Sequence, residues 1–500
     1  MEKQNISPLD SLWLWVNTFL AENKVPFLAA FITGLVAHGY AFTNKLVNHD
    51  EVESLFGKGA TITSGRWGLE LVKVLFPDWS MPWIYGLVSL VLISLAVCLA
   101  VRLLAIRSKP LQAILAMLVL SFPSLTGNFS FMFTSSAYAL SFFLAILSVW
   151  LFLKGGRLNV LFSVVCLIFA LSMYQAYIAV AASLFVVLMI ARALDGVSIK
   201  DNVLYGLKAL VMMGLSIAVY YAMCLLVFKF TGAEFNSYVT ENVTGNVSML
   251  RKVRMAYDAF FYVFQFRNFY IISTEASRYI HILLALVAIV GLVSAKKLPN
   301  VCMAAFLVAL LPLSICCMYL IMSNESIHTL VMYSFVAVYM LLAVVLERLE
   351  IKPAAIIKDI TALLLMVVVV SNVYFANMVY LKMDLQYENA KSFYTTLMTQ
   401  VKETEGFDEN SRLAIIGKQD NLLHSFPQLD TELLLGPARD LVNIYSRENF
   451  IKYYLGFDIP FATEAELSAL QEDARVQAMA EYPYYGSVIK VDDFIVVKLG

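Results

Sequence analysis

Three carboxylates lie in one short polar run that follows the first long apolar segment. Residues 48–53 read NHDEVE, which places Asp50, Glu51 and Glu53 where that segment leaves the bilayer. Ionisable groups at a membrane boundary are costly unless they are solvated or used. Partial desolvation raises the basicity of a carboxylate, which suits it to take a proton from a substrate hydroxyl. The run therefore predicts a candidate general base.

An arginine follows about fifteen residues later, in the run SGRWG at residues 64–68. Arg66 can return to the same surface if the intervening loop folds into short helices at the interface, where Trp67 also fits. A guanidinium donates two parallel hydrogen bonds to a phosphate. A base and a phosphate clamp at one membrane face suggest group transfer from a lipid-linked phosphate. The alternative is a solvated loop with incidental charges.

Two more polar groups are expected at ends of apolar segments on the same side. Tyr174 and Gln175 begin the run YQAY, in which a hydrogen-bonding amide between tyrosine rings could hold a sugar. An interfacial aromatic belt explains the tyrosines equally well. Glu325 and His328 share one helix face if that segment is helical. They could pair on a substrate or a metal, or simply cap and solvate the segment.

The composition indicates that lipid surrounds most of the chain. Of its 500 residues, 60% are hydrophobic and 15% are charged, whereas soluble domains are about 45–50% apolar and about 25% charged. The net charge of −1 gives no field that would attract nucleic acid. The six cysteines all lie in apolar runs, which predicts buried thiols and neither disulfides nor a zinc site.

The apolar segments predict about eleven membrane-spanning helices, because a helix needs about 20 mostly apolar residues to cross a bilayer. We expect them near residues 26–46, 82–106, 110–126, 134–153, 158–174, 175–194, 204–230, 279–295, 300–322, 328–347 and 356–380.

The distribution of basic residues between the short connections predicts the orientation. Every second connection is basic, whereas residues 125–133, 171–177 and 323–328 contain no lysine or arginine. Basic loops face the cytoplasm. The N-terminus is then cytoplasmic, and the acidic loop and the C-terminal segment are extracytoplasmic. The basic set comprises Arg102, Arg107, Lys109, Lys154, Arg157, Arg192, Lys200, Lys296, Lys297, Arg348, Lys352 and Lys358.

The two ends of the chain differ from its centre. Residues 1–25 contain an amphipathic stretch with Trp13 and Trp15, which indicates a helix on the membrane surface. Residues 381–500 are charged and contain no segment long enough to span. There we expect a helix over 391–401, a strand over 412–416 and a terminal β-hairpin around Asp492 and Asp493. The chain is thus divided into an interfacial helix (1–25), a membrane domain (26–380) and a small extracytoplasmic α/β domain (381–500).

Several catalytic motifs are missing from the sequence. It has no Gly-rich phosphate loop ending in Gly-Lys-Ser/Thr, no His-Glu-x-x-His pair and no Gly-x-Ser-x-Gly elbow. Nucleotide-driven work, zinc peptidase chemistry and the serine hydrolase elbow are therefore unsupported.

Taken in order, the run at 48–51, the run at 64–67, the Phe122-Pro123 turn and the Tyr174-Gln175 pair resemble a known family. They are similar to the type II Gtr glucosyltransferases, which decorate O-antigen and related surface polysaccharides in bacteria. That family belongs to the GT-C class of multi-span glycosyltransferases. The resemblance covers roughly residues 25–380 by layout and is sharpest at 48–67 and 172–177.

The resemblance implies a GT-C-like α-helical polytopic protein of the bacterial cytoplasmic (inner) membrane. It implies a donor of polyprenyl-phosphate glucose, a surface polysaccharide acceptor, and a donor synthase and flippase in the same pathway. Asp50 matches the catalytic base, with Glu51 as the alternative, and Arg66 matches a donor-phosphate ligand. The class admits a divalent metal, but no obligatory cofactor is expected. The residues expected to bind substrate are His49, Glu53, Trp67, Tyr174, Gln175, Glu325 and His328.

Two other functions remain open from the sequence. A flippase or exporter of lipid-linked saccharide would move its substrate without forming a glycosidic bond. It would also need a charged cavity through the bilayer, which the predicted spans do not obviously supply. The third alternative is a membrane scaffold whose outer domain binds a partner.

Overall fold

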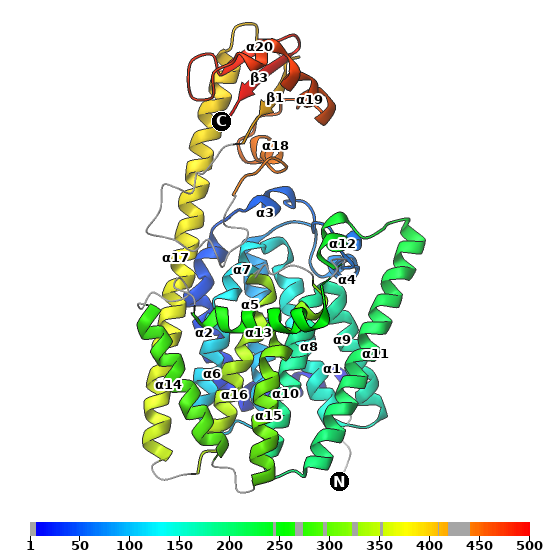
Figure 1. Cartoon of the computed structure of the whole chain (residues 1–500), viewed down its shortest axis with the longest axis vertical. Helices are drawn as coiled ribbons and strands as arrows, with labels where there is room; N and C mark the ends of the chain where they lie inside the picture. Colours follow the sequence, from blue (N-terminus) through cyan, green and yellow to red (C-terminus); the bar gives the residue numbers. More distant parts are fainter. Residues whose placement is uncertain are drawn as a thin grey trace.

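The protein is a bundle of apolar helices with a small domain at one end, to which a single long helix connects it (Figure 1). The computed structural model describes residues 7–243, 247–265, 274–293, 298–322, 329–350, 354–408, 410–418 and 441–500. Within these residues the bundle contributes the largest hydrophobic core, and two smaller cores lie in and beneath the small domain.

Seven described helices are long and apolar enough to cross a membrane. Their apolar residues face lipid on one side and pack against neighbouring helices on the other. The backbone polar groups form hydrogen bonds within each helix. They are α2 (Lys24–Thr43), α5 (Pro82–Leu103), α8 (Met132–Lys154), α10 (Ile178–Leu194, preceded by the 3-10 turn η3, Gln175–Tyr177), α11 (Ile199–Thr231), α15 (Leu298–Ile315) and α17 (Ala354–Glu403).

An eighth span is broken. Helices α6 (Lys109–Ser121) and α7 (Ser124–Ser130) meet at an angle of 49°, where a single span had been expected over 110–126. Phe122 is extended because the ring of Pro123 disfavours the helical conformation for the residue before it. The break turns α7 inwards, and all seven of its residues are buried.

Shorter apolar helices occupy the remaining predicted spans. These are α9 (Arg157–Met173), α14 (Thr274–Val293) and the η7–α16 segment (Tyr333–Phe335 and Val336–Glu347). Each predicted span thus has a helical counterpart among the described residues, and the crossing count of eleven stays a prediction. The six cysteines are free thiols, but the expected burial is wrong for Cys302, which lies on the outer surface of α15 and is exposed.

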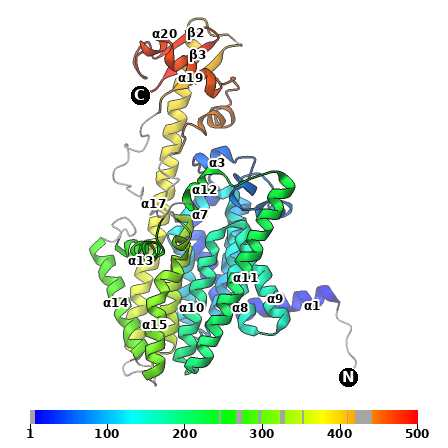
Figure 2. The ribbon, with the colours of Figure 1, turned by 45° about the vertical axis from the view of Figure 1, so that its right-hand side comes forward.

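The connections expected on one side of the membrane do lie together. Arg348 pairs with Asp195 at 2.7 Å, and Glu347 accepts a hydrogen bond from the Ser108 N–H at 3.2 Å. Helix α1 (Pro8–Glu22) projects sideways near this end (Figure 2), and Arg102 bonds its neighbour Asn23 at 3.0 Å. The expected helix is present, and its location on the membrane surface stays a prediction. Which end faces the cytoplasm stays a prediction.

Helix α17 links the bundle to the small domain. Its 50 residues correspond to about 75 Å at 1.5 Å per residue, far more than a bilayer needs. The helix runs through the predicted domain boundary at residue 380 without a break and includes the helix expected over 391–401.

The small domain contains a three-stranded sheet in the order β1-β3-β2. Strands β2 (Val488–Val491) and β3 (Phe494–Lys498) form the predicted antiparallel hairpin, and Asp492 adopts a left-handed conformation in its turn. Strand β1 (Arg412–Ile416) pairs with β3 in parallel. The expected strand and hairpin are therefore confirmed. The remaining helices here are α18 (Arg447–Asn449), a π-helical turn η10 (Phe450–Tyr454), α19 (Glu464–Glu472) and α20 (Ala474–Gln477).

Candidate active site

The acidic run forms a short helix, α3 (His49–Glu53), at the end of the bundle beneath the small domain (Figure 1). Asn48 caps this helix, since its side-chain oxygen accepts the Glu51 N–H at 2.9 Å. Its amide nitrogen donates to the Ser130 carbonyl at the end of α7. One asparagine therefore both starts the acidic helix and ties it to the broken span.

Glu51 is fully buried and occupied by structural bonds. Its carboxylate pairs with Lys45 and accepts a hydrogen bond from Ser80. The Phe133 N–H at the start of α8 also donates to it, at 3.2 Å. A buried carboxylate needs such partners to offset its lost hydration. These contacts make Glu51 a link between the first loop and α8.

Lys58 lies next to this ion pair and is also buried. Its ammonium donates to the Phe133 carbonyl at 2.7 Å and lies 4.7 Å from the Tyr85 ring centroid. Burial lowers the pKa of Lys58 to about 8, although Asp78 and Glu51 oppose the shift. Lys58 is thus held by a carbonyl oxygen and an aromatic ring, whereas Lys45 pairs with a carboxylate.

Asp50 differs from Glu51, because 44% of its side chain is exposed. One carboxylate oxygen accepts a hydrogen bond from the Tyr445 hydroxyl of the small domain and lies 3.7 Å from His49 Nε2. The Tyr445 ring meets the His49 ring edge-on at 5.6 Å. The amide of Asn449 donates to Glu53 at 2.6 Å. Three predicted site residues therefore contact the C-terminal domain.

Arg66 contacts two aromatic side chains of the bundle. Its guanidinium donates to the Tyr138 hydroxyl at 3.2 Å and stacks on the Tyr174 ring at 4.8 Å. Tyr138 and Tyr174 stack on each other with centroids 4.5 Å apart. Trp67 beside it is buried. The structure thus brings together Arg66 and Tyr174, which are far apart in the sequence.

Gln175 supports the arginine loop. Its amide nitrogen donates to the Ser64 carbonyl at 2.7 Å and to the Tyr220 hydroxyl at 2.8 Å. Tyr220 in turn donates to the Gly65 carbonyl at 3.0 Å. Gly65 has a φ of +71°, which favours glycine, and a Cβ there would lie 2.7 Å from the Tyr220 oxygen. Gln175 thus fixes the turn that presents Arg66.

The N-terminal part of α8 holds both halves of the first loop. Phe133 bonds Glu51, and Tyr138, five residues further along, bonds Arg66. Five helical residues correspond to a rise of about 7.5 Å. The acidic helix and the arginine turn are therefore attached to one rigid element at one end of the bundle.

Glu325 and His328 lie outside the described residues. The neighbouring Thr329 packs against α7, where a Cβ on Gly127 would lie 2.8 Å from its hydroxyl oxygen. Among the described residues, no group of three or more histidines, cysteines and carboxylates has the arrangement of a metal site.

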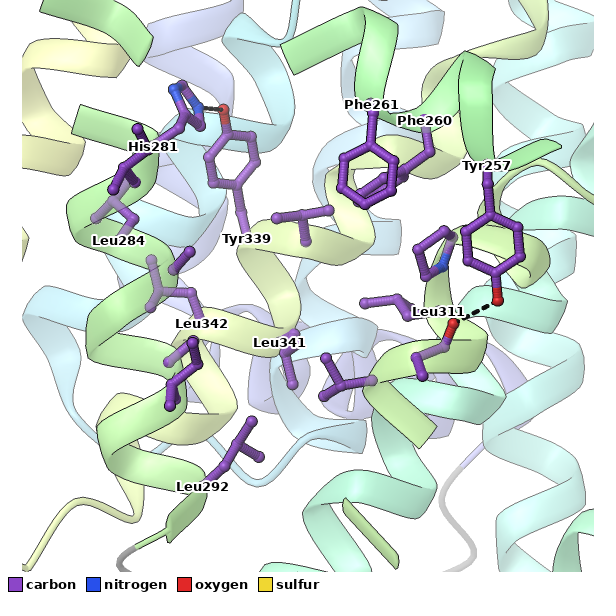
Figure 3. A pocket seen from close by; sticks show the side chains of 18 residues that line it. Tyr257, Phe260, Phe261, His281, Leu284, Leu292, Leu311, Tyr339, Leu341 and Leu342 are labelled. Carbon is purple, nitrogen blue, oxygen red and sulfur yellow. Dashed lines mark hydrogen bonds between the residues drawn. The ribbon is translucent and has the colours of Figure 1, made fainter. Parts of the chain in front are cut away.

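An apolar groove of about 730 Å³ lies between α14, α15 and α16, beneath α13 (Met249–Gln265) (Figure 3). Its lining is mostly aliphatic. His281 and Tyr339 form a hydrogen bond of 3.2 Å in one wall, and the Tyr257 hydroxyl donates to the Ala309 carbonyl at 2.7 Å (Figure 3). Such a surface within a bundle suits a lipid chain.

Apolar spanning helices with a polar loop folded over one end define a multi-span membrane protein. The model of the glucosyl transferase GtrII family matches residues 39–341, well over half of the chain. The protein therefore belongs to the glucosyl transferase GtrII family, and it is a glycosyltransferase. The match includes α3, Arg66, α8 and Gln175, and it ends within α16. No curated protein and no solved structure matches the chain.

Sequence reasoning missed the partners that hold the site. The sequence around Lys45 and Tyr138 does not predict their contacts. Glu51 lies across a turn from Lys45, and Arg66 is 72 residues from Tyr138. Tyr445 is 395 residues from Asp50, so no spacing argument could connect them.

Proposed function

We propose that this enzyme transfers a hexose, glucose, from polyprenyl phosphate to a surface polysaccharide on the outer face of the cytoplasmic membrane. The observation that carries the proposal is the shared attachment of the acidic helix and the Arg66 turn to α8. A base and a phosphate ligand held on one element can act on one substrate. Membership of the GtrII family supports the transfer of glucose.

Asp50 acts as the general base. Its carboxylate is accessible, whereas that of Glu51 is buried and bonded on both oxygens. Asp50 takes the proton of the acceptor hydroxyl as the hydroxyl oxygen forms its bond to the anomeric carbon. A positioned base of this kind contributes about 10²–10⁴ in rate.

Arg66 stabilises the departing phosphate. The bond between the anomeric carbon and the phosphate oxygen breaks, and the electron pair leaves with polyprenyl phosphate. Its contact with the Tyr174 ring and its hydrogen bond to Tyr138 hold the guanidinium in place before the charge develops. A single displacement inverts the anomeric centre.

The groove between α14, α15 and α16 is the proposed site of the isoprenoid tail. Its aliphatic lining matches the chemistry of that chain, and its place among the membrane helices lets the tail enter from lipid. The proposal thus assigns separate surfaces to the head group and the tail of the donor.

The test is a transfer assay with purified protein in liposomes. Labelled glucose is supplied either as polyprenyl-phosphate glucose or as a nucleotide sugar, together with a lipid-linked saccharide acceptor. We expect a new glycosidic bond only from the lipid-linked donor. Direct use of the nucleotide sugar would refute the donor assignment. Movement of the lipid-linked sugar across the membrane without a new bond would favour the exporter function instead.

A further inference from the structure

The C-terminal domain meets the acidic helix along a regular face. Three of its side chains, spaced four residues apart over the turn before α18, α18 itself and η10, contact three side chains spaced three residues apart on α3 and the turn after it. Spacings of three and four residues place side chains on one helix face. Tyr445 donates a hydrogen bond to Asp50, and Asn449 donates one to Glu53 at 2.6 Å. The rings of Tyr453 and Phe56 meet edge-on, with their centroids 5.3 Å apart.

The segment that bears these side chains is anchored on its other side. Arg447 donates to the Ile415 carbonyl and to the Gly417 carbonyl, at 3.1 Å for the latter, at the end of β1. Phe450 is fully buried, and its ring lies 5.6 Å from that of Tyr394 on α17. Since the sheet and α17 both fix this segment, its outer face is held rigidly over α3.

The acidic helix contributes to the same core. Val52, between the two contacted carboxylates, is fully buried and belongs to one hydrophobic cluster with Phe450 and Ile451. Burial of apolar side chains stabilises such a contact by about 25 cal/mol per Å². The docking of the domain therefore rests on packing as well as on hydrogen bonds.

The hydrogen bond to Asp50 fixes the carboxylate that we assign as the base. The Tyr445 hydroxyl donates to Oδ1, so Oδ2 can receive the acceptor proton. Burial, together with the neighbouring Asp50, raises the pKa of Tyr445, so its hydroxyl remains a donor at neutral pH. Catalytic groups must be held to within about 0.5 Å of their productive position.

We propose that Tyr445 is a positioning residue for Asp50, and that the C-terminal domain thereby completes the active site. This inference rests on the proposed function, because it takes Asp50 as the base. It assigns a role in catalysis to a part of the chain outside the family match at residues 39–341.

The test compares two variants that each remove one hydroxyl from the same face. In Tyr445→Phe the ring remains and the bond to Asp50 is lost. We expect kcat to fall about tenfold, the order expected when a charged group loses one hydrogen bond, with KM unchanged for donor and acceptor. In Tyr453→Phe the ring contact with Phe56 remains, and we expect wild-type kcat and KM.

Three outcomes would overturn the inference. An unchanged kcat in Tyr445→Phe would remove the positioning role, and a raised kcat would make Tyr445 a gate that the acceptor displaces. Equal losses in both variants would indicate a purely structural face. Asp50→Asn separates this test from that of the proposed function. Full transfer by that variant would refute the base assignment, whereas an inactive Asp50→Asn with a normal Tyr445→Phe would refute only the inference.

Discussion

Replacing Glu51 by glutamine should reduce stability and leave the chemistry intact. The glutamine amide has nearly the same shape as the carboxylate, but only its oxygen accepts hydrogen bonds. Ser80 and the Phe133 N–H donate to different oxygens of Glu51, so glutamine keeps only one of these two bonds. The variant also loses the negative charge that pairs with Lys45. Because Glu51 lies at the link between the first loop and α8, the loss should weaken that link.

The expected cost follows from burial of the pair. Removing one partner of a buried ion pair costs about 3–5 kcal/mol, because the other charge is left uncompensated. Lys45 retains 27% exposure and can regain some hydration, which places the cost near the lower limit, at about 3 kcal/mol. Asp50→Asn is the matched control. Its side chain is 44% exposed, so we expect a change in stability of about 0.5 kcal/mol or less.

The assay measures both properties on the same preparations. Thermal unfolding in detergent reports stability, and transfer per folded molecule, measured well below the transition, reports catalysis. We expect Glu51→Gln to unfold at a lower temperature with near-normal transfer, and Asp50→Asn to show the reverse. Loss of transfer in Glu51→Gln without loss of stability would refute the structural role of Glu51.

Three further predictions concern the loop and the groove. Gly68→Ala should raise the donor KM, because the new Cβ would lie 2.9 Å from the backbone carbon of Ser172 and displace the Arg66 turn; Gly39→Ala, which meets no atom within 4 Å, should not. Between pH 8 and 10.5 the folded chain holds fewer protons at Lys58 than the unfolded chain, so the free energy of unfolding should rise with pH. Lys58→Met should flatten that rise, and an unchanged pH dependence of unfolding would contradict this. Ala288→Trp, which fills the groove, should raise KM for a long-chain donor more than for a short-chain one, and an equal effect of both donors would contradict the tail site.

The hydropathy pattern predicts the elements of this fold well. Long apolar runs identify the spanning helices, and two short apolar runs around Asp492 and Asp493 identify the hairpin, because both signals are local. The single span expected over 110–126 is wrong, because the chain bends between α6 and α7 at the Phe122-Pro123 turn. The continuity of α17 was also missed, because a change in composition at residue 380 resembles a domain boundary.

The site could be predicted only in part. The acidic run and the Arg66 turn are identifiable by residue type, and the structure attaches both to α8. The family resemblance favours Asp50 over Glu51 by motif position, but residue type alone does not separate them, because their difference is one of burial, which depends on Lys45 and on α8. Gln175 was expected to hold a sugar, whereas its amide nitrogen bonds the Arg66 turn. That expectation stays untested.

The most direct test of the central claim is transfer by Asp50→Asn in liposomes that contain polyprenyl-phosphate glucose and acceptor. The asparagine keeps the size of the side chain and can still accept the hydrogen bond from Tyr445, but it cannot take a proton. We predict that transfer falls by about 10²–10⁴, with donor binding and thermal unfolding unchanged. Transfer at the wild-type rate would contradict the account of Asp50 as the base of this glucosyltransferase.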